Sequence, residues 1–402
     1  MRKLYSNYIS SFRGFSKEIW ILALVTLINR AGTMVLPFLT KYLKEDIQFT
    51  LSEVGTIMIF FGLGSMAGSW LGGKMTDKVG FYKVMVFSLL VSGFMFIGLQ
   101  YIRTFWGFCF GIFGIMSVAD MFRPAMFVSL NTYAKPENRT RALTLIRLAI
   151  NLGFSAGPAI GGLIIISMGY PGLFWIDGIT CVIAIVIFVL LVKEKYLEIP
   201  HEAVSKKAIN SFLKDTPYLI FLMVSFIMAV VFFQLFTTIP LYHADVYQLS
   251  EFETGLLLSL NGILVFALEM PLVHHAEKLK INNLKIVGGS MILLAMGFLI
   301  MAFEGWIGIL IISIVLLSVA EMYGFPFGND FAMKRSQLGK AGNYMGAYTM
   351  SFSLAHILSS KTGLLVIENY GYTVNWIFMG VLSIIGFLFC VFLRNYLKKS
   401  TI

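Results

Sequence analysis

Two copies of a short motif place a carboxylate within long apolar stretches. Residues 117–122 read SVADMF and residues 318–323 read SVAEMY, so Asp120 and Glu321 lie half the chain apart. An ionised carboxylate in apolar surroundings is unfavourable unless a cation or hydrogen-bond donors accompany it, and otherwise it takes up a proton. Both acids are therefore candidates for charge pairing or for proton transfer.

The two acids differ in the residues that follow them. Arg123 lies three residues after Asp120, on the same helical face, which predicts an ion pair that keeps Asp120 charged. Three and four residues after Glu321 stand Gly324 and Phe325, so its own helix offers no cation on that face. We expect Glu321 to bind a proton near neutral pH and to act as the proton carrier.

Further charged residues lie within apolar segments. They are two acids and three bases: Asp177, Glu269, Arg30, Arg147 and Lys361. A charge at the centre of a membrane costs at least about 2.5–3.5 kcal/mol, so we expect these residues to pair or to line a water-filled cavity, with Arg30 and Arg147 in the charge network of the two acids. For each of them the alternative to a role in transport is a purely structural salt bridge that holds two helices together. Asp177 and Glu269, close to predicted helix ends where water could reach them, fit that alternative best.

The elements that must position these residues are membrane helices. The 402 residues are 58% hydrophobic and 13% charged, with a mean hydropathy of +0.81, which is far from the composition of a soluble domain. Apolar segments of about 20 residues, long enough to cross a bilayer, recur along the chain. The sequence predicts an all-α membrane protein of twelve transmembrane helices, near 19–41, 52–73, 80–101, 105–133, 142–167, 173–192, 216–241, 252–273, 284–303, 306–333, 342–366 and 373–394.

The chain is also an internal repeat. Residues match in order at a spacing of about 200, as in the pairs Glu53 and Glu253, Trp106 and Trp306, Pro124 and Pro326, and Gly169-Tyr170 and Gly371-Tyr372. We expect two pseudo-symmetric six-helix halves, 19–192 and 216–395, with a shared cavity near the middle of the bilayer. A lead-in (1–18), a linker (193–215) and a tail (396–402) complete the domain organisation.

Basic residues predict the orientation in the membrane. Most Lys and Arg fall in the termini and in alternate loops, whereas the opposite loops hold only Lys41, Lys44 and Arg103. Positive charge favours the cytoplasmic side, so both termini and the linker are expected there. This distribution explains the net charge of +10 without a nucleic-acid partner. The cysteines Cys109, Cys181 and Cys390 have no metal-site spacing, and we interpret them as small buried side chains.

Two glycine-containing motifs stand near helix ends and within a helix. GGKMTDKVGFYK (72–83) reads as a short cytoplasmic loop in which Asp77 can face the N-terminus of a neighbouring helix. NLGFSAGPAIGG (151–162) holds glycines at spacings that let helix backbones approach closely. The G-x-S-x-G pattern within it would require a strand and a sharp turn for a serine hydrolase, and its flanks are helical instead.

The first motif resembles the G-x-L-A-D-R-x-G-R-K signature of the major facilitator superfamily. The residues in the expected places include Gly73, Asp77, Lys78 and Gly80, whereas Phe81 and Tyr82 replace the usual Arg-Lys pair. The resemblance covers essentially the whole chain. It implies alternating access between two halves, and in many members of this family the fourth helix, with an arginine comparable to Arg123, belongs to the coupling machinery.

The second motif is similar to the G-x-x-x-G-P-x-x-G-G signature of the drug:proton antiporter branch of that family. Every glycine and the proline are present: Gly153, Gly157, Pro158, Gly161 and Gly162. The resemblance implies an exporter driven by protons.

Together these features predict a proton-coupled exporter of small amphipathic organic compounds in a bacterial inner membrane. We expect a monomer without cofactor or metal whose partners are the substrate, protons and the bilayer. Candidate cavity residues are Asn29, Asn151, Gln234, Asn261 and His356. A symporter, or an exporter of one metabolite or lipid-like solute, stays open as an alternative. A membrane-embedded enzyme would need a catalytic constellation, and a receptor would more plausibly carry a soluble domain. The sequence offers neither feature.

Overall fold

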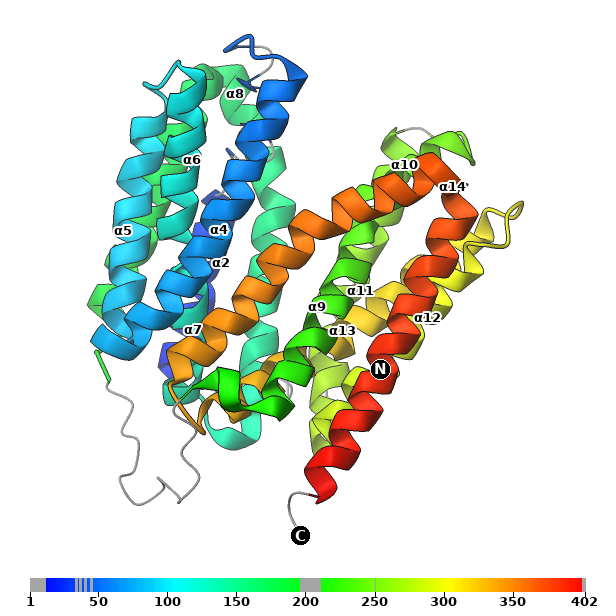
Figure 1. The fold of residues 1–402 in the computed structure, drawn as a ribbon. Coiled ribbons are helices and arrows are strands. Elements are labelled where there is room, and N and C mark those ends of the chain that lie inside the picture. Colours follow the sequence, from blue (N-terminus) through cyan, green and yellow to red (C-terminus); the bar gives the residue numbers. More distant parts are fainter. Residues whose placement is uncertain are drawn as a thin grey trace, which may run out of the picture. The chain divides into compact units, whose positions relative to one another are not determined.

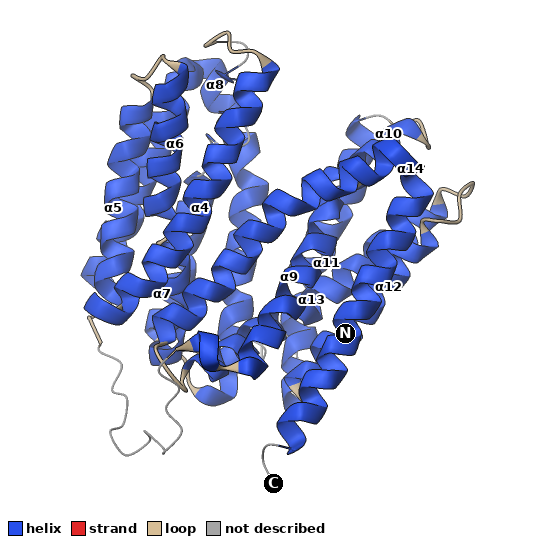
Figure 2. Ribbon diagram, in the orientation of Figure 1, coloured by secondary structure: helices blue, strands red, loops and turns tan. Residues whose placement is uncertain are grey.

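The computed structural model describes residues 12–32, 35, 38, 39, 42, 43, 46–195, 211–249 and 251–399. In this part of the chain all regular structure is helical and no β-strand occurs (Figure 2). Most of the expected linker, the first part of the lead-in and the end of the tail lie outside the described residues.

The long helices follow the predicted spans closely (Figure 1). In the first half they are α2 (Lys17–Gly32), α4 (Leu51–Val79), α5 (Phe81–Leu99), α6 (Phe105–Ala119), α7 (Phe122–Tyr133) and α8 (Arg139–Leu191). In the second half they are α9 (Thr216–Thr237), α10 (Ile239–Asp245), α11 (Glu251–Lys278), α12 (Asn283–Ile300), α13 (Gly308–Ser336) and α14 (Ala341–Lys399). Short 3-10 turns cover Pro136–Asn138 (η1) and Phe212–Lys214 (η3).

The two longest helices are each two spans joined at a glycine. α8 bends at Gly169, with φ 69° and ψ −176°, and α14 bends at Gly371, with φ 83° and ψ 174°. A positive φ is unfavourable for residues with a side chain, so glycine allows the chain to reverse there without strain. These residues occupy equivalent places in the sequence repeat, and each bend divides its helix into the fifth and sixth spans of one half.

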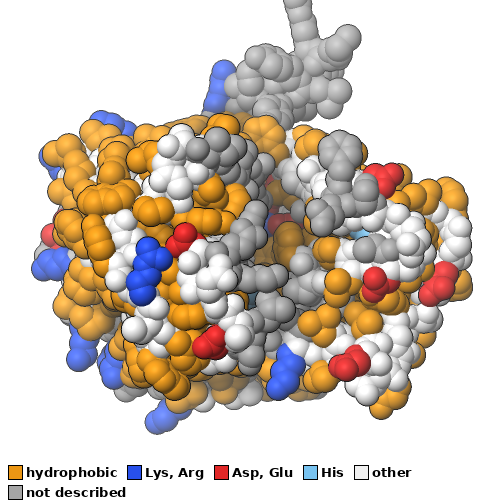
Figure 3. All heavy atoms as spheres, turned by 90° about the horizontal axis from the view of Figure 1, so that it is seen from above, with side chains coloured by type: hydrophobic (Ala, Val, Ile, Leu, Met, Phe, Trp, Pro, Cys, Tyr) orange, Lys and Arg blue, Asp and Glu red, His pale blue; other side chains and the backbone are white. Residues whose placement is uncertain are grey.

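The helix count agrees with a twelve-helix membrane fold. Among the described residues nine helices are long and apolar enough to cross a membrane, with α14 counted once although its bend makes two spans. α2 and the first part of α8 complete the twelve. Apolar side chains such as Trp70, Trp106 and Trp306 are exposed, and Figure 3 shows many hydrophobic side chains at the surface. Such an apolar exterior is typical of a protein whose surface faces lipid.

The described chain divides into two compact units. One comprises Gly14–Asn210 together with Ser336–Met350, and the other comprises Ser211–Arg335 together with Ser351–Ile402. The main segments of the two units meet in the chain between Asn210 and Ser211. However, the first turns of α14, which belong to the second half of the sequence repeat, pack in the unit of the first half.

Each unit has an aromatic core. In the first unit Tyr42 packs against Phe108, Tyr170 and Phe174 with ring centroids 5.2–6.2 Å apart. In the second unit Trp376 is fully buried, and its ring centroid lies 5.0 Å from that of Tyr242. The Tyr242 hydroxyl donates a hydrogen bond to the Met301 carbonyl oxygen. Large rings bury much apolar area, so they contribute strongly to the stability of each bundle.

A glycine stripe brings α4 close to α6 and α7. Gly64, Gly68 and Gly72 share one face of α4, and a Cβ on Gly68 would lie 2.6 Å from the Ser117 carbonyl oxygen. At such a distance the backbones of the two helices must separate before any side chain fits. The stripe thus fixes how closely α4 approaches the helix that carries Asp120.

We therefore expect Gly68→Ala to destabilise the protein. Overpacking of a close crossing costs about 1–3 kcal/mol, so the midpoint of thermal unfolding of the purified protein should fall by several degrees. Gly262→Ala is the matched control, because a Cβ there meets nothing within 4 Å. Equal midpoints for both variants and the wild type would show that the stripe does not set the helix spacing.

Candidate functional site

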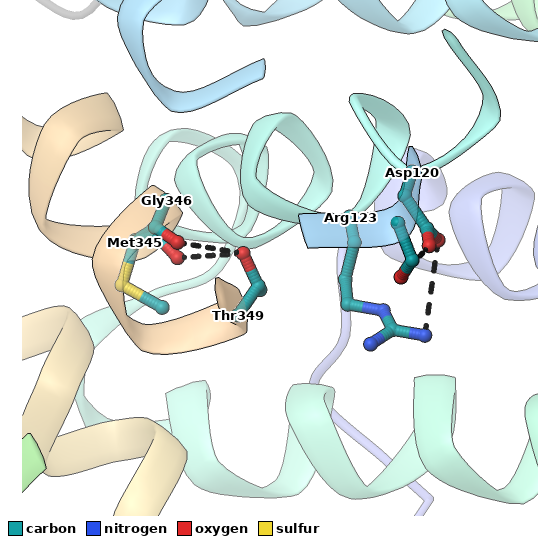
Figure 4. A network of polar contacts seen from close by, with 6 residues as sticks. Asp120, Arg123, Met345, Gly346 and Thr349 are labelled. Atoms are coloured by element: carbon teal, nitrogen blue, oxygen red, sulfur yellow. Dashed lines mark hydrogen bonds and ion pairs between the residues drawn. The ribbon is translucent and has the colours of Figure 1, made fainter. Parts of the chain in front are cut away.

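Asp120 lies at a break in the fourth span. α6 ends at Ala119 and α7 begins at Phe122, and Asp120 between them is only 7% exposed. Its carboxylate accepts a short hydrogen bond from the Ser65 hydroxyl of α4. An Arg123 terminal nitrogen lies 3.9 Å from the other carboxylate oxygen, and Figure 4 shows the guanidinium directed towards Asp120. The first acid thus has a neutral donor and a cation.

The remaining arginines of the expected network divide between two places. Arg30 of α2 interacts electrostatically with Arg123 and Asp120, so it belongs to the same charge cluster. Arg147 of α8 instead interacts with Tyr348 at the beginning of α14. The structure therefore brings Arg30 to Asp120, whereas no described contact joins Arg147 to that acid.

Glu321 lies in a different kind of environment. Its side chain is 8% exposed, and its Oε2 accepts a hydrogen bond of 3.1 Å from the Asn261 amide nitrogen of α11. The same nitrogen donates to the Ser318 hydroxyl oxygen over 2.9 Å, and Ser318 donates to the Ile314 carbonyl oxygen over 2.7 Å. The second acid is thus bound by a neutral amide from the neighbouring helix.

The two halves therefore share one arrangement. In each, a polar side chain from the second span donates to the acid of the fourth span: Ser65 to Asp120, and Asn261 to Glu321. The sequence analysis did not single out Ser65, and it treated Asn261 as a cavity candidate. The only sign of Ser65 in the sequence is that it is a small polar residue within an apolar helix. Such a residue indicates which face of the helix is polar, but it does not identify the acid on another helix that it binds.

Only one of the two fourth spans is broken. The repeat pairs Pro124 with Pro326 and so suggests a similar break in both halves, but α13 continues without interruption through Glu321 and Pro326. In the first half the break puts Pro124 in the first turn of α7, where a missing N–H disturbs no helical bond. Pro326 lies in the interior of α13, where the helix loses one hydrogen bond and continues.

The expected cytoplasmic loop is mostly helix. α4 continues to Val79, so Gly73, Asp77 and Lys78 lie in its last turns, and only Gly80, with φ 88°, separates it from α5. The prediction of a loop was wrong because the glycines at positions 72 and 73 pack closely within the helix instead of ending it. A positive φ at Gly80 ends the helix.

Asp77 binds the beginning of α14. Its two carboxylate oxygens accept hydrogen bonds of 2.7 Å from the backbone N–H groups of Gly342 and Asn343. The first N–H groups of a helix lack partners within the helix, and a negative charge there is favourable. Gly73 lies at the same crossing, where a Cβ on it would come within 2.8 Å of the Gly346 Cα. Within this unit, α4 and the start of α14 are thus in backbone contact.

The glycine motif of α8 packs in part against α2. A Cβ on Gly153 would lie 2.8 Å from the Ala31 backbone nitrogen, so this position requires glycine. Gly157, Pro158, Gly161 and Gly162 are helical within α8. The side-chain surroundings of Gly157, Pro158 and Gly162 lie outside what the structure describes.

The cavity candidates divide between the two units. Asn29 donates to the Cys181 sulfur over 3.4 Å, and Asn151 is half-buried in the same unit. In the other unit Gln234 is fully buried and donates to the Ser359 carbonyl oxygen over 2.8 Å. His356 is exposed and packs edge-on against a phenylalanine. Gln234 therefore joins two helices of its own unit.

Two acids expected close to water are buried. Asp177 and Glu269 are 1% and 0% exposed. An Asp177 oxygen accepts a hydrogen bond of 2.9 Å from the Val35 backbone N–H, so this carboxylate replaces a helical partner at the end of the first span. The expectation failed because position along a helix does not reveal what the neighbouring chain covers. Among the described residues no cluster of His, Cys, Asp and Glu is arranged to hold a metal ion.

Comparisons with known proteins agree with this architecture. The family model described as Major Facilitator Superfamily matches residues 22–360. The MFS-type transporter YqjV of Bacillus subtilis (strain 168) is 23% identical over 392 residues, 95% of each chain. The quinolone resistance protein NorA of Staphylococcus aureus (strain Mu50 / ATCC 700699) is 24% identical over 349 residues, 83% of this chain and 86% of NorA. The crystal structure of the human organic anion transporter MFSD10 superimposes with a TM-score of 0.75 at 16% identity, covering 93% of this chain and 100% of that one, and so supports the fold.

The charge cluster leads to a prediction about folding. Asp120→Asn keeps the shape of the side chain but removes the charge that faces Arg123, and hydrogen bonds to charged groups contribute about 1.5–3 kcal/mol. We expect a lower expression level and a lower unfolding midpoint. The double variant Asp120→Asn/Arg123→Leu should recover part of this loss, because it removes the uncompensated cation. A single variant as stable as the wild type would contradict the pairing.

Proposed function

Because the chain belongs to the major facilitator superfamily and is a multi-pass membrane transporter, we propose that it exports small amphipathic organic compounds in exchange for protons. The observation that carries this proposal is the environment of Glu321, a buried acid that a neutral amide binds. Such an acid can change its protonation state within the membrane, which is what coupling to a proton gradient requires.

Two features support export over uptake, and a third concerns the charge of the substrate. The motif from Gly153 to Gly162 resembles the antiporter branch, and Gly153 packs directly on the first span. A relative that matches most of this chain, NorA, bears the name of a quinolone resistance protein. The charged residues within the spans carry both signs, so the spans do not favour a substrate of one charge. We place the protein in the inner membrane of a bacterium as a monomer with both termini in the cytoplasm.

The alternatives differ in direction and in substrate range. A symporter would accumulate its substrate inside when the proton gradient points inward, and a specific exporter would act on one metabolite or lipid-like solute. The test is expression in an efflux-deficient bacterial strain, followed by growth on cationic, anionic and neutral amphipathic compounds. Increased tolerance to several unrelated compounds supports the proposal, whereas increased sensitivity supports uptake.

Asp77 is proposed to stabilise one access state. Since its carboxylate binds the first N–H groups of α14, Asp77→Asn removes a favourable charge interaction of about 0.3–1 kcal/mol and one of two acceptor oxygens. We expect slower turnover with substrate binding near normal, measured as ethidium efflux from loaded vesicles and as ethidium binding to the purified protein. Asp46→Asn, which alters an exposed ion pair with Arg103, is the matched control. Unchanged efflux by well-expressed Asp77→Asn protein would remove this role.

Glu321 is proposed as the proton carrier. Glu321→Gln keeps the shape and the hydrogen bond but cannot titrate, so it should express normally and bind substrate while losing transport driven by a pH gradient. The membrane potential supplies about 2.3 kcal/mol per charge per 100 mV, and a variant that moves no proton cannot use this term for a neutral substrate. Exchange without a gradient should survive.

The measurement is transport into vesicles that contain equal amounts of each variant. Asp120→Asn serves as the comparison, because its acid faces a cation and is proposed to stay charged. Gradient-driven accumulation retained by Glu321→Gln but lost by a well-folded Asp120→Asn variant would exchange the two assignments.

A further inference from the structure

Asn261 is positioned to serve both protonation states of Glu321. Its amide nitrogen donates to the Glu321 carboxylate over 3.1 Å and to the Ser318 hydroxyl oxygen over 2.9 Å, so both of its N–H bonds are used. The Ser318 hydroxyl donates onward to the Ile314 carbonyl oxygen over 2.7 Å. The donors of Asn261 and Ser318 therefore point in the direction that suits an ionised carboxylate.

Protonation of Glu321 reverses what that carboxylate needs. A carboxylic acid carries an O–H that requires an acceptor, and an amide carries a carbonyl oxygen on the same planar group as its nitrogen. Rotation of the Asn261 amide by about half a turn exchanges the two atoms, so Oδ1 would accept from protonated Glu321. The Ser318 hydroxyl can then turn from the Ile314 carbonyl oxygen and donate to Oδ1 as well.

We infer that Asn261 is a positioning residue whose amide reverses when Glu321 takes up or releases its proton, so that the acid keeps a hydrogen-bond partner in both states. The inference rests on the proposed role of Glu321. Loss of a hydrogen-bond partner in a dry interior is unfavourable, so an amide that can either donate or accept suits both protonation states of the acid it touches. The amide thereby lowers the free-energy difference between the protonated and the ionised states of Glu321, both of which must form during transport.

The first half shows the contrast. Asp120 receives its hydrogen bond from a hydroxyl, which can donate or accept, and also faces an arginine at 3.9 Å. An arginine cannot become an acceptor, because the guanidinium has donors alone, and its positive charge favours the ionised carboxylate. The amide at Glu321 is neutral and can donate or accept, so it can bind either protonation state.

Other ionisable groups surround α13 and must be considered. α9, α11, α12 and α14 all contact it within this unit. The charged or titratable side chains of these helices include Glu269 and His274 on α11 and Lys285 near the start of α12. On α14 they include His356, Lys361, Glu368, Cys390 and Arg394. Their charges would influence the proton affinity of Glu321 but cannot replace the amide that touches it.

The test is infrared spectroscopy of the purified protein in lipid nanodiscs during a pH titration. A carboxylic C=O band that is present in the wild type and lost in Glu321→Gln reports the protonation of Glu321. We expect Asn261→Leu to move the midpoint of that band upward by about one pH unit, because the ionised form loses a charge-assisted bond and the neutral form loses a weaker one. The pH profile of gradient-driven ethidium efflux should shift in parallel.

Two further variants keep the test decisive. Asn261→Asp has the same shape and places a second carboxylate beside Glu321, so the midpoint should rise further than in Asn261→Leu. Asn283→Leu is the matched control, because the Asn283 amide donates to another acid of α13, Asp330, over 2.7 Å. This variant should leave the Glu321 midpoint unchanged.

The outcomes separate the two levels of the proposal. If Glu321→Gln removes no titrating band and keeps gradient-driven efflux, the proton-carrier role fails. If the band is present and its midpoint is the same in wild type, Asn261→Asp and Asn261→Leu, the role of Asn261 fails while that of Glu321 stands. A midpoint that moves equally in Asn283→Leu or Glu269→Gln would assign the effect to general changes in packing or charge and would overturn the inference.

Discussion

An acid buried between apolar helices needs a hydrogen-bond donor from a neighbouring helix, and this requirement governs the arrangement of both halves. The bonds from Ser65 to Asp120 and from Asn261 to Glu321 join the second span to the fourth span in each bundle. The apolar exterior does not drive helix association in a membrane, because lipid is as apolar as the side chains that face it. Close packing and these polar bonds therefore decide which helices are neighbours.

The two halves meet this requirement in different ways. In the first half glycines bring α4 close to α6, so the short Ser65 side chain can reach Asp120. The positions of the second half that match those glycines carry leucines, and the longer amide of Asn261, about one turn earlier in the repeat, reaches Glu321 instead. The two halves thus use donors of different length for acids at equivalent positions.

The sequence predicts the helices well, because a chain that crosses lipid must satisfy its backbone bonds within each helix, and apolar length then marks each span. The repeat also places the reversals at Gly169 and Gly371. Partners on other helices could not be predicted, because periodicity identifies the face of a residue and not the side chain opposite it. Asp177 illustrates this, since its carboxylate binds a backbone N–H of the first span, far away in sequence.

Helix α4 also links the acid of the first half to the start of α14. Ser65, near its middle, binds Asp120, and Asp77, about three turns further on, binds the first N–H groups of α14. A continuous helix moves as one body over this length, and α4 is continuous from Leu51 to Val79. A displacement of α4 at Asp120 therefore also displaces the carboxylate at Gly342 and Asn343. Because glycine contacts bring the backbones together at both crossings, a shift of α4 would have to change both contacts together.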